Sequence, residues 1–121
     1  MDLFLKVAPL ASTTISADLD RPDEVFELAA ELFRVLSAPM RLKIISCLRD
    51  GEKNVSYLLR KIGTTQPNMS QHLNTLYQNG VLGKRRDGVQ MYYRIIDPRV
   101  PELCHVVCTK IETEGKSKTV P

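Results

Sequence analysis

Residues 55–95 read VSYLLRKIGTTQPNMSQHLNTLYQNGVLGKRRDGVQMYYRI, and the order of the patterns inside them predicts the fold. Apolar side chains recur at the helical period over residues 55–62, and Gly63 follows as a helix stop. Residues 64–65 are threonines that can cap the next helix, which we expect to continue to Gln78. Two short helices joined by so tight a turn are typical of a helix-turn-helix.

A β-hairpin is predicted directly after the second of these helices. Residues 81–86 and 90–96 are rich in β-forming side chains and flank Asp87-Gly88, a dipeptide favoured in tight hairpin turns. A hairpin in this position is a wing. We therefore predict a mainly α domain with a small β-hairpin, of the winged helix-turn-helix class.

Three further helices complete the predicted order α-α-α-α-β-β-α. The first spans residues 22–36, where Pro22 suits the first helical turn, and the second spans residues 39–50. The last begins at residues 97–98 or at residues 101–102. The expected organisation is a flexible arm over residues 1–20, a folded domain over residues 21–112 and a disordered tail over residues 113–121.

The predicted helix over residues 22–36 is apolar on two sides. Val25 and Leu28 belong to one apolar stripe, and Phe26 and Phe33 belong to another. Such a helix has to be covered on both sides, and a small domain has few elements for that purpose. We therefore expect a homodimer.

The composition excludes several other classes of protein. The chain has 121 residues, 43% hydrophobic and 26% charged, which is typical of a folded domain. Its apolar runs fall short of the roughly 18–20 residues of a membrane span, and three dispersed cysteines do not form a secreted disulfide framework. The sequence also contains no catalytic-triad, zinc-protease or phosphate-loop motif. We expect a cytoplasmic protein that is neither an enzyme nor a membrane protein.

The charge is concentrated in the middle of the chain. Residues 1–34 carry three basic and seven acidic side chains, a net charge of −4. Residues 35–99 carry eleven basic and four acidic side chains, a net charge of +7, and residues 100–121 are balanced. A basic middle segment favours a polyanionic partner such as nucleic acid.

The helix predicted over residues 65–78 has a polar face suited to base edges in a major groove. Its side chains donate and accept hydrogen bonds, and none is a carboxylate that would repel phosphate. The candidate DNA-binding residues of this helix are Thr65, Gln66, Asn68, Ser70, Gln71, His72 and Asn74. Lys84, Arg85 and Arg86 lie beside the predicted wing tip, where they can contact the phosphate backbone. The expected partner is double-stranded promoter DNA.

These segments resemble the ArsR/SmtB family of winged-helix repressors. The similar segments are LSAPMRLKIISCL at residues 36–48, SQHL at residues 70–73 and GVLGKRRDGVQMYYRI at residues 80–95. The resemblance covers about residues 25–110. It implies a homodimer built through the first and last helices, and promoter repression that is relieved when an inducer is sensed.

Two metal sites of that family are missing from this sequence. Arsenic sensors have cysteines in the segment that here reads KNVSYLL, where Asn54 and Ser56 stand instead. Zinc sensors have an aspartate followed two residues later by a histidine, whereas here Asp97 is followed by Arg99, and no HxxH pattern comes after it.

A thiol- and persulfide-sensing branch of the family pairs a cysteine on the second helix with one on the last. Cys47, with Cys104 or Cys108, is similar in location to that pair. Ser46 stands at the position of the branch's second-helix thiol, one residue before Cys47.

The spacing of the cysteines by itself also predicts what chemistry they can carry out. Cys104 and Cys108 are four residues apart on one helix face, with Cβ atoms roughly 5–6 Å apart, too far for an unstrained disulfide. Two such thiolates can share a soft metal or metalloid ion, and Cys47 can add a third sulfur or form a disulfide with one of them. The candidate sensing residues are therefore Cys47, Cys104 and Cys108, with His105 as an additional ligand.

Three alternatives stay open at this point. The three thiols can be structural, since free cysteines are often small buried apolar residues, and the protein then has no thiol inducer. A small thiol enzyme using Cys104 with His105 is disfavoured because adjacent helical residues point about 100° apart. A dimerisation module that binds no DNA is the third alternative.

Overall fold

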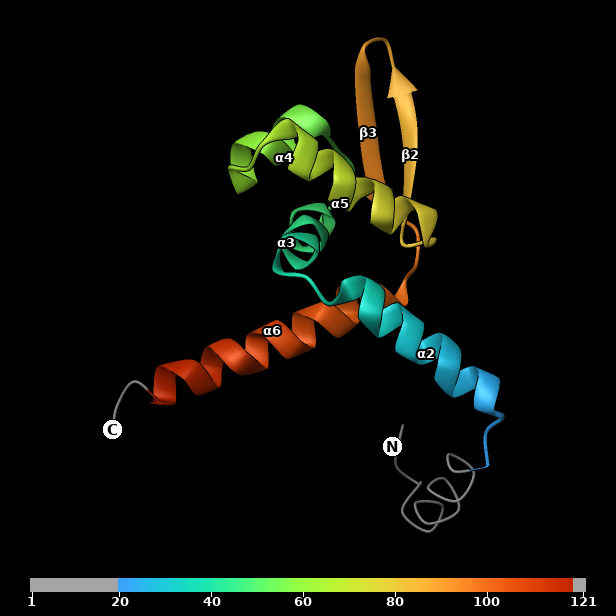
Figure 1. Ribbon diagram of the computed structural model, residues 1–121. Coiled ribbons are helices and arrows are strands. Elements are labelled where there is room, and N and C mark those ends of the chain that lie inside the picture. The colour runs from blue at the N-terminus through green and yellow to red at the C-terminus, as the bar shows by residue number, and fades with distance from the viewer. Residues whose placement is uncertain (1–19, 119–121) are drawn as a thin grey trace. The chain divides into compact units, whose positions relative to one another are not determined.

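The computed structural model describes residues 20–118, which contain five helices and a three-stranded sheet (Figure 1). The arm expected over residues 1–20 therefore lies, except for Asp20, outside the described residues. The elements in chain order are α2 (Asp23–Leu36), α3 (Pro39–Leu48), β1 (Lys53–Asn54), α4 (Val55–Ile62), α5 (Gln66–Gln78), β2 (Leu82–Asp87), β3 (Gln90–Ile95) and α6 (Arg99–Lys118). The predicted order of helices and hairpin, that of a winged helix-turn-helix, is confirmed.

The described residues form two compact units that are divided in the chain between Arg34 and Val35. The first unit holds most of α2, which begins with the acidic pair Asp23 and Glu24 and has Arg34 in its last turn, as the helix dipole favours. Its large apolar side chains lie on the surface, and Leu28 is 69% exposed. This helix therefore presents an apolar surface.

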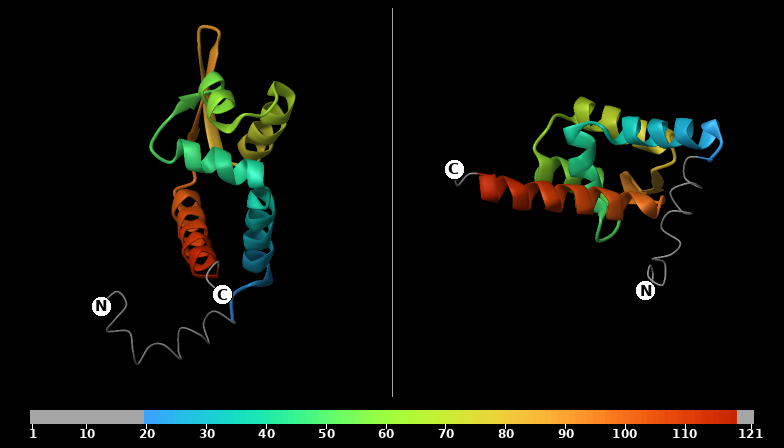
Figure 2. Two further views of the ribbon diagram at one scale, coloured as in Figure 1. Left: turned by 90° about the vertical axis from the view of Figure 1, so that its left-hand side faces the viewer. Right: turned by 90° about the horizontal axis from the view of Figure 1, so that it is seen from below.

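The second unit is built around α3, which contacts α4, α5, α6 and β3. Apolar side chains recur at the helical period, so that one apolar stripe of each helix faces this centre. The buried apolar side chains of the second unit come from every main element: Val35, Leu36, Ile44, Ile45, Leu48, Leu58, Met69, Leu73, Leu76, Val81, Leu82, Tyr93, Val100 and Cys104. The β2–β3 hairpin projects away from this core, as Figures 1 and 2 both show.

The strand β1 is the element that the sequence does not predict. It has two residues, and it pairs with β3 so that the sheet order is β1-β3-β2. Two residues are too few to show the alternation of apolar and polar side chains by which a strand is recognised in a sequence. This strand takes its conformation by pairing with β3. It joins the start of α4 to the base of the wing.

Two boundaries in the middle of the chain differ from the sequence predictions. The helix expected to reach residue 50 ends at Leu48, and the chain turns through Gly51, whose N–H donates to the Leu48 carbonyl (3.1 Å). The hairpin turn is Gly88-Val89 instead of Asp87-Gly88, because Asp87 still pairs with Gln90. Gly88 has φ +64°, which a two-residue hairpin turn requires at its first position.

The last helix begins and ends at residues that the structure fixes. Of the two starts considered, the earlier one is close: Asp97 Oδ1 accepts a hydrogen bond from the backbone N–H of Arg99 (3.0 Å), where α6 begins. The helix continues to Lys118, six residues into the segment expected to be a tail. No helix within the described range is long and apolar enough to cross a membrane.

Candidate DNA-binding surface and cysteine sites

The helix α5 is held at its N-terminus by two threonines. Thr65 is its N-cap, and its hydroxyl accepts from the backbone N–H of Asn68 (3.2 Å). The hydroxyl of Thr64 accepts from the side-chain amide of the same asparagine (2.9 Å). Asn68, which was predicted to contact DNA, is therefore half-buried in the turn and already bonded there.

The opposite faces of α5 differ in the way that a recognition helix requires. Met69, Leu73 and Leu76 have no exposed surface and anchor the helix on the core. Four of the predicted DNA-binding side chains are exposed on the other face: Gln66, Ser70, Gln71 and Asn74. These four offer amide and hydroxyl groups to a ligand without a competing carboxylate.

His72 lies between these two faces and has a partner within the protein. Its Nδ1 lies 3.1 Å from Nη1 of Arg41 on α3, and the same arginine donates to the Val35 carbonyl (2.5 Å). Burial lowers the pKa of His72, and the positive charge of Arg41 lowers it further. The histidine is thus neutral at pH 7 and links the recognition helix to α3.

The three basic side chains of the wing have different surroundings. The ammonium of Lys84 lies 4.3 Å from the centre of the Tyr77 ring on α5. Two guanidinium nitrogens of Arg85 each lie 2.9 Å from a carboxylate oxygen of Glu52. Arg86 is exposed and has no ion pair or ring contact among residues 20–118. Glu52 is 33 residues from Arg85 in the chain, so no local pattern could have predicted that ion pair.

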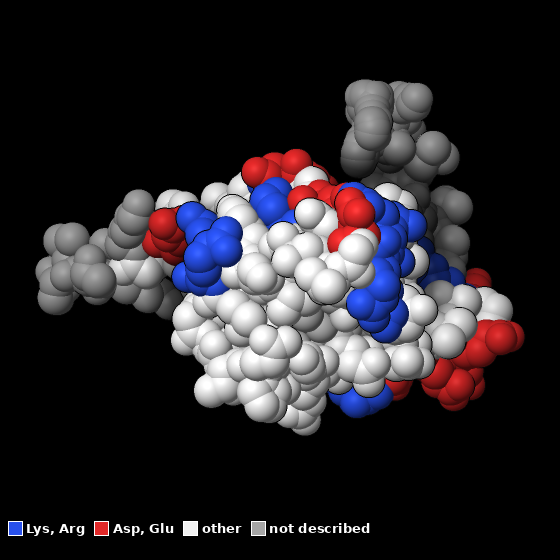
Figure 3. Space-filling view, turned by 90° about the horizontal axis from the view of Figure 1, so that it is seen from above, with Lys and Arg blue, Asp and Glu red and all other residues white. Residues whose placement is uncertain are grey.

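The face above α4, α5 and the wing is mostly free of charged side chains. In Figure 3 a broad area of this face has no Lys, Arg, Asp or Glu, and basic patches lie at its margins. Acidic atoms lie beside several of these patches. An uncharged centre with basic side chains at its margins matches a surface that meets base edges in the middle and phosphates at the sides.

The three cysteines are free thiols in different environments. Cys47 on α3 is half-buried, Cys104 on α6 is buried, and Cys108 on α6 is exposed. Cys47 and Cys108 line one cavity of about 380 Å³ together with Ser46 and Lys61. The structure thus brings together, around one cavity, one cysteine from each of the two helices that the sequence analysis considered.

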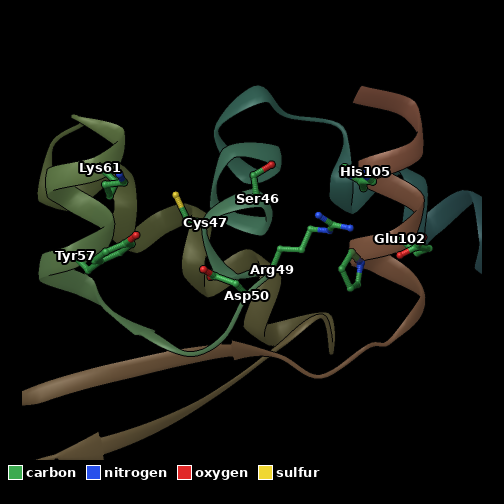
Figure 4. Close-up of a pocket in the computed structure, with 9 residues that line it drawn as sticks. Ser46, Cys47, Arg49, Asp50, Tyr57, Lys61, Glu102 and His105 are labelled. Carbon is green, nitrogen blue, oxygen red and sulfur yellow. The ribbon is translucent and has the colours of Figure 1, made fainter. Parts of the chain in front are cut away.

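A second, larger cavity of about 780 Å³ lies between α3, α4 and α6. Figure 4 shows Cys47 pointing from α3 toward Tyr57 and Lys61 of α4, while Arg49 points toward Glu102 and His105 of α6. His105 is exposed and lies on the far side of α3 from the Cys47 sulfur in this view.

The buried cysteine differs chemically from the other two. Burial raises the pKa of the Cys104 thiol, and the neighbouring Cys108 raises it further, so Cys104 stays protonated at neutral pH. Within the described part of the chain, no group of three or more His, Cys, Asp or Glu side chains could hold a metal ion. The three-sulfur site considered from the sequence is therefore not assembled in this conformation.

The fold and this surface define a class of protein, the winged helix-turn-helix DNA-binding regulators. The model of the family described as "Bacterial regulatory protein, arsR family" matches residues 38–84. The chain belongs to this family. It is a DNA-binding transcriptional repressor of the winged-helix type and not an enzyme, in agreement with the sequence analysis.

Individual relatives and a solved structure support the same assignment. The probable mercury resistance operon repressor of Streptomyces lividans is 30% identical over 127 residues, which cover 94% of this chain and 100% of that protein. The HTH-type transcriptional repressor SmtB of Mycobacterium tuberculosis is 35% identical over 95 residues, covering 78% of this chain and 68% of that one. The homodimeric winged helix-turn-helix DNA-binding domain Mb0332 of Mycobacterium bovis superimposes with a TM-score of 0.68 at 26% identity, covering 81% of this chain and 91% of that one.

Proposed function

We propose that this protein is a homodimeric repressor that binds its promoter with α5 in the major groove and is released by chemistry at Cys47 and Cys108. The observation that carries the proposal is the pairing of an uncharged polar face on α5 with a two-thiol cavity on the adjacent helix α3. In this proposal the protein acts on promoter DNA in the cytoplasm.

The readers of the base edges are the four exposed side chains of α5. Gln and Asn can bind adenine bidentately, and Ser can bind several bases. Thr65 is exposed at the N-terminus of α5, where the positive end of the helix dipole favours a phosphate. Asn68 and His72 support the recognition helix and do not themselves contact the DNA, because each is already bonded inside the protein.

The proposed dimer uses the exposed apolar faces of α2 and α6. Phe33 is 56% exposed on α2, and Val106 and Ile111 are 58% and 62% exposed on α6. Apolar side chains of this size are expected to be covered in a stable assembly. The homodimeric state of the Mycobacterium bovis relative supports this assignment. Sedimentation velocity at micromolar concentration should give a dimer, and Phe33→Glu should give monomers.

The proposed signal is oxidation of a thiol pair. Cys47 and Cys108 line the same cavity, one from α3 and one from α6. An oxidant such as an organic persulfide or disulfide would take up two electrons and two protons and leave a Cys47–Cys108 disulfide. Because this bond joins α3 to α6, it would couple the proposed dimer interface to the helix that holds α5.

A soft metal ion is the second candidate signal, favoured by similarity to the mercury resistance repressor. Thiolates select soft ions, and Cys47 and Cys108 supply two of them. The described residues do not supply a third or fourth ligand, so they do not fit a closed tetrahedral site within one chain. They fit a soft ion that accepts two sulfur ligands, such as mercury(II).

Binding of the protein to its own upstream DNA, followed by fluorescence anisotropy, tests the proposal. The reduced protein should bind, and treatment with a persulfide donor, diamide or mercury(II) should release it. A loss of two hydrogens by mass spectrometry identifies oxidation, and an added metal mass identifies coordination. A triple Cys→Ser variant that responds like the parent would place sensing elsewhere in the protein.

A further inference from the structure

The two faces of the wing carry different kinds of charge. In the β2–β3 register Gly83 pairs with Arg94 and Arg85 pairs with Tyr92, so these side chains lie on one face of the sheet. Lys84 belongs to the other face, together with the buried Tyr93 with which it pairs. Arg86 lies on the same face as Lys84, two residues further toward the tip. This second face contacts the recognition helix, because Lys84 lies over the Tyr77 ring of α5.

The first face is closed by an ion pair with a bidentate geometry. Arg85 Nε and Nη2 each lie 2.9 Å from a different oxygen of Glu52, and its guanidinium carbon lies 4.6 Å from the centre of the Tyr92 ring. Glu52 directly precedes β1, and Tyr92 pairs across the sheet with both Arg85 and Asn54. We name these three residues, Glu52, Arg85 and Tyr92, the wing brace.

The surroundings keep the brace ionised and in place. Arg85 lowers the pKa of Glu52 through this hydrogen bond, and Arg94 contributes a further positive charge. The guanidinium of Arg94 lies across Gly83, where an added Cβ would come within 3.2 Å of its Cζ. A planar fork bound to a carboxylate and stacked on a ring is a geometry that lysine cannot reproduce.

We infer that Arg85 is a positioning residue that fixes the angle of the wing, and that duplex DNA meets the wing on the opposite face through Arg86. The inference rests on the proposed function, in which the protein binds promoter DNA. Lys84 stands on that same face over Tyr77 and joins the base of the wing to the end of α5. The three adjacent cations of the wing therefore have separate roles: Lys84 joins it to α5, Arg85 braces it, and Arg86 contacts phosphate.

Salt dependence separates a phosphate contact from a brace. Each phosphate neutralised adds about 0.9 to the slope of log K against log salt, so Arg86→Gln should reduce the slope by about 2 for a dimer. Arg85→Gln should leave the slope unchanged and weaken binding by about two- to fivefold per protomer, as the loss of a well-formed surface pair would. Arg85→Gln and Arg86→Gln remove the same charge from neighbouring residues, so each serves as the matched control for the other.

The acidic partner gives a second test in which the two explanations predict opposite signs. Glu52→Gln removes a negative charge near DNA, so simple electrostatics predicts tighter binding, whereas loss of the brace predicts weaker binding. The exchanged pair Glu52→Arg with Arg85→Glu restores an ion pair without changing the net charge, and it should recover part of the lost affinity, because Arg94 and Asp87 then face like charges. Hydrogen exchange in the free dimer should show faster exchange of the β2–β3 amides in Glu52→Gln and slower exchange again in the exchanged pair.

Each other outcome overturns a stated part of the inference. A slope reduced by Arg85→Gln as much as by Arg86→Gln would show that Arg85 leaves Glu52 to bind phosphate. Tighter binding by Glu52→Gln, or no recovery in the exchanged pair when its melting temperature equals that of the parent, would refute the brace. A slope unchanged by Arg86→Gln would refute the contact between wing and DNA, and hydrogen exchange on the free protein would still judge the brace by itself.

Discussion

Replacing one cysteine at a time should divide the three thiols into a responsive pair and a structural residue. Cys47→Ser and Cys108→Ser should bind DNA when reduced and stay bound after treatment with a persulfide donor or diamide, because each lacks half of the proposed disulfide. Cys104→Ala should respond as the parent does. Its side chain is 7% exposed, and its raised pKa leaves it protonated, so it supplies little of the thiolate that attacks an oxidant.

The size of the effect can be worked out in two ways. A hundredfold loss of DNA affinity on oxidation corresponds to about 2.7 kcal/mol, within the usual range of coupling between two sites. A Cys47–Cys108 disulfide would also close a loop of about 60 residues, which in the chain-entropy model stabilises the folded state by up to about 4 kcal/mol. The oxidised protein should therefore bind DNA more weakly while it unfolds at a higher temperature.

Anisotropy with labelled promoter DNA, differential scanning calorimetry and peptide mass mapping of the same samples make up the assay. The mapped disulfide should join the peptides that contain Cys47 and Cys108. A disulfide involving Cys104, or release of DNA by oxidised Cys108→Ser, would refute the assignment. A fall in melting temperature together with DNA release would show that oxidation unfolds the domain instead of switching it.

Three further perturbations test the recognition helix and its support. Gln71→Ala should cost about 1–3 kcal/mol of specific DNA affinity per half-site and relax sequence preference. The same change at Gln78, the last residue of α5, should cost little. Competition between specific and random duplexes measures both effects. Leu73→Ala, at a fully buried position, should lower the free energy of unfolding by about 2–5 kcal/mol in urea titrations. Because the pKa of His72 is lower when folded than when unfolded, its contribution to stability is present above the ordinary histidine pKa of about 6.5 and is lost as the pH falls below it. His72→Gln should remove that loss, and unfolding midpoints at pH 7.5 and pH 5.5 would show whether it does.

Local sequence signals account for the bounds of α4, the helix that precedes the recognition helix α5. The helix α4 has the predicted bounds, because Asn54 caps it through the backbone N–H of Tyr57 (2.8 Å) and Gly63 ends it with φ +75°. Such caps and stops depend on a few neighbouring residues, so they can be read without knowledge of the fold. The two-residue strand β1 has no such signal, since it exists only by pairing with β3.

The roles of single site residues were harder to predict than their positions. His72 and Arg85 were expected to contact DNA, and each has a protein partner 31 or 33 residues away along the chain. Sequence patterns identify a polar or basic side chain, but tertiary packing decides whether a protein partner already occupies it. The proposed contacts with DNA are accordingly reduced to side chains without such partners, of which Gln71 and Arg86 are examples.

The placement of α3 explains how thiol chemistry could reach the recognition helix without touching DNA. This helix carries Cys47 on the side of the cavity that it shares with Cys108 of α6, and it carries Arg41, whose guanidinium holds His72 of α5. A bond between the two sulfurs would pull on α3, and α3 cannot shift without moving the Arg41–His72 contact or breaking it. An inducer changes affinity only through a difference between two states, so this contact is where the two states should differ.

Arg41→Lys keeps the charge but loses the planar guanidinium, and it should weaken the effect of oxidation on DNA binding while leaving the Cys47–Cys108 disulfide able to form. Full release of DNA by the oxidised Arg41→Lys variant would show that the coupling runs through the dimer interface instead of through α3.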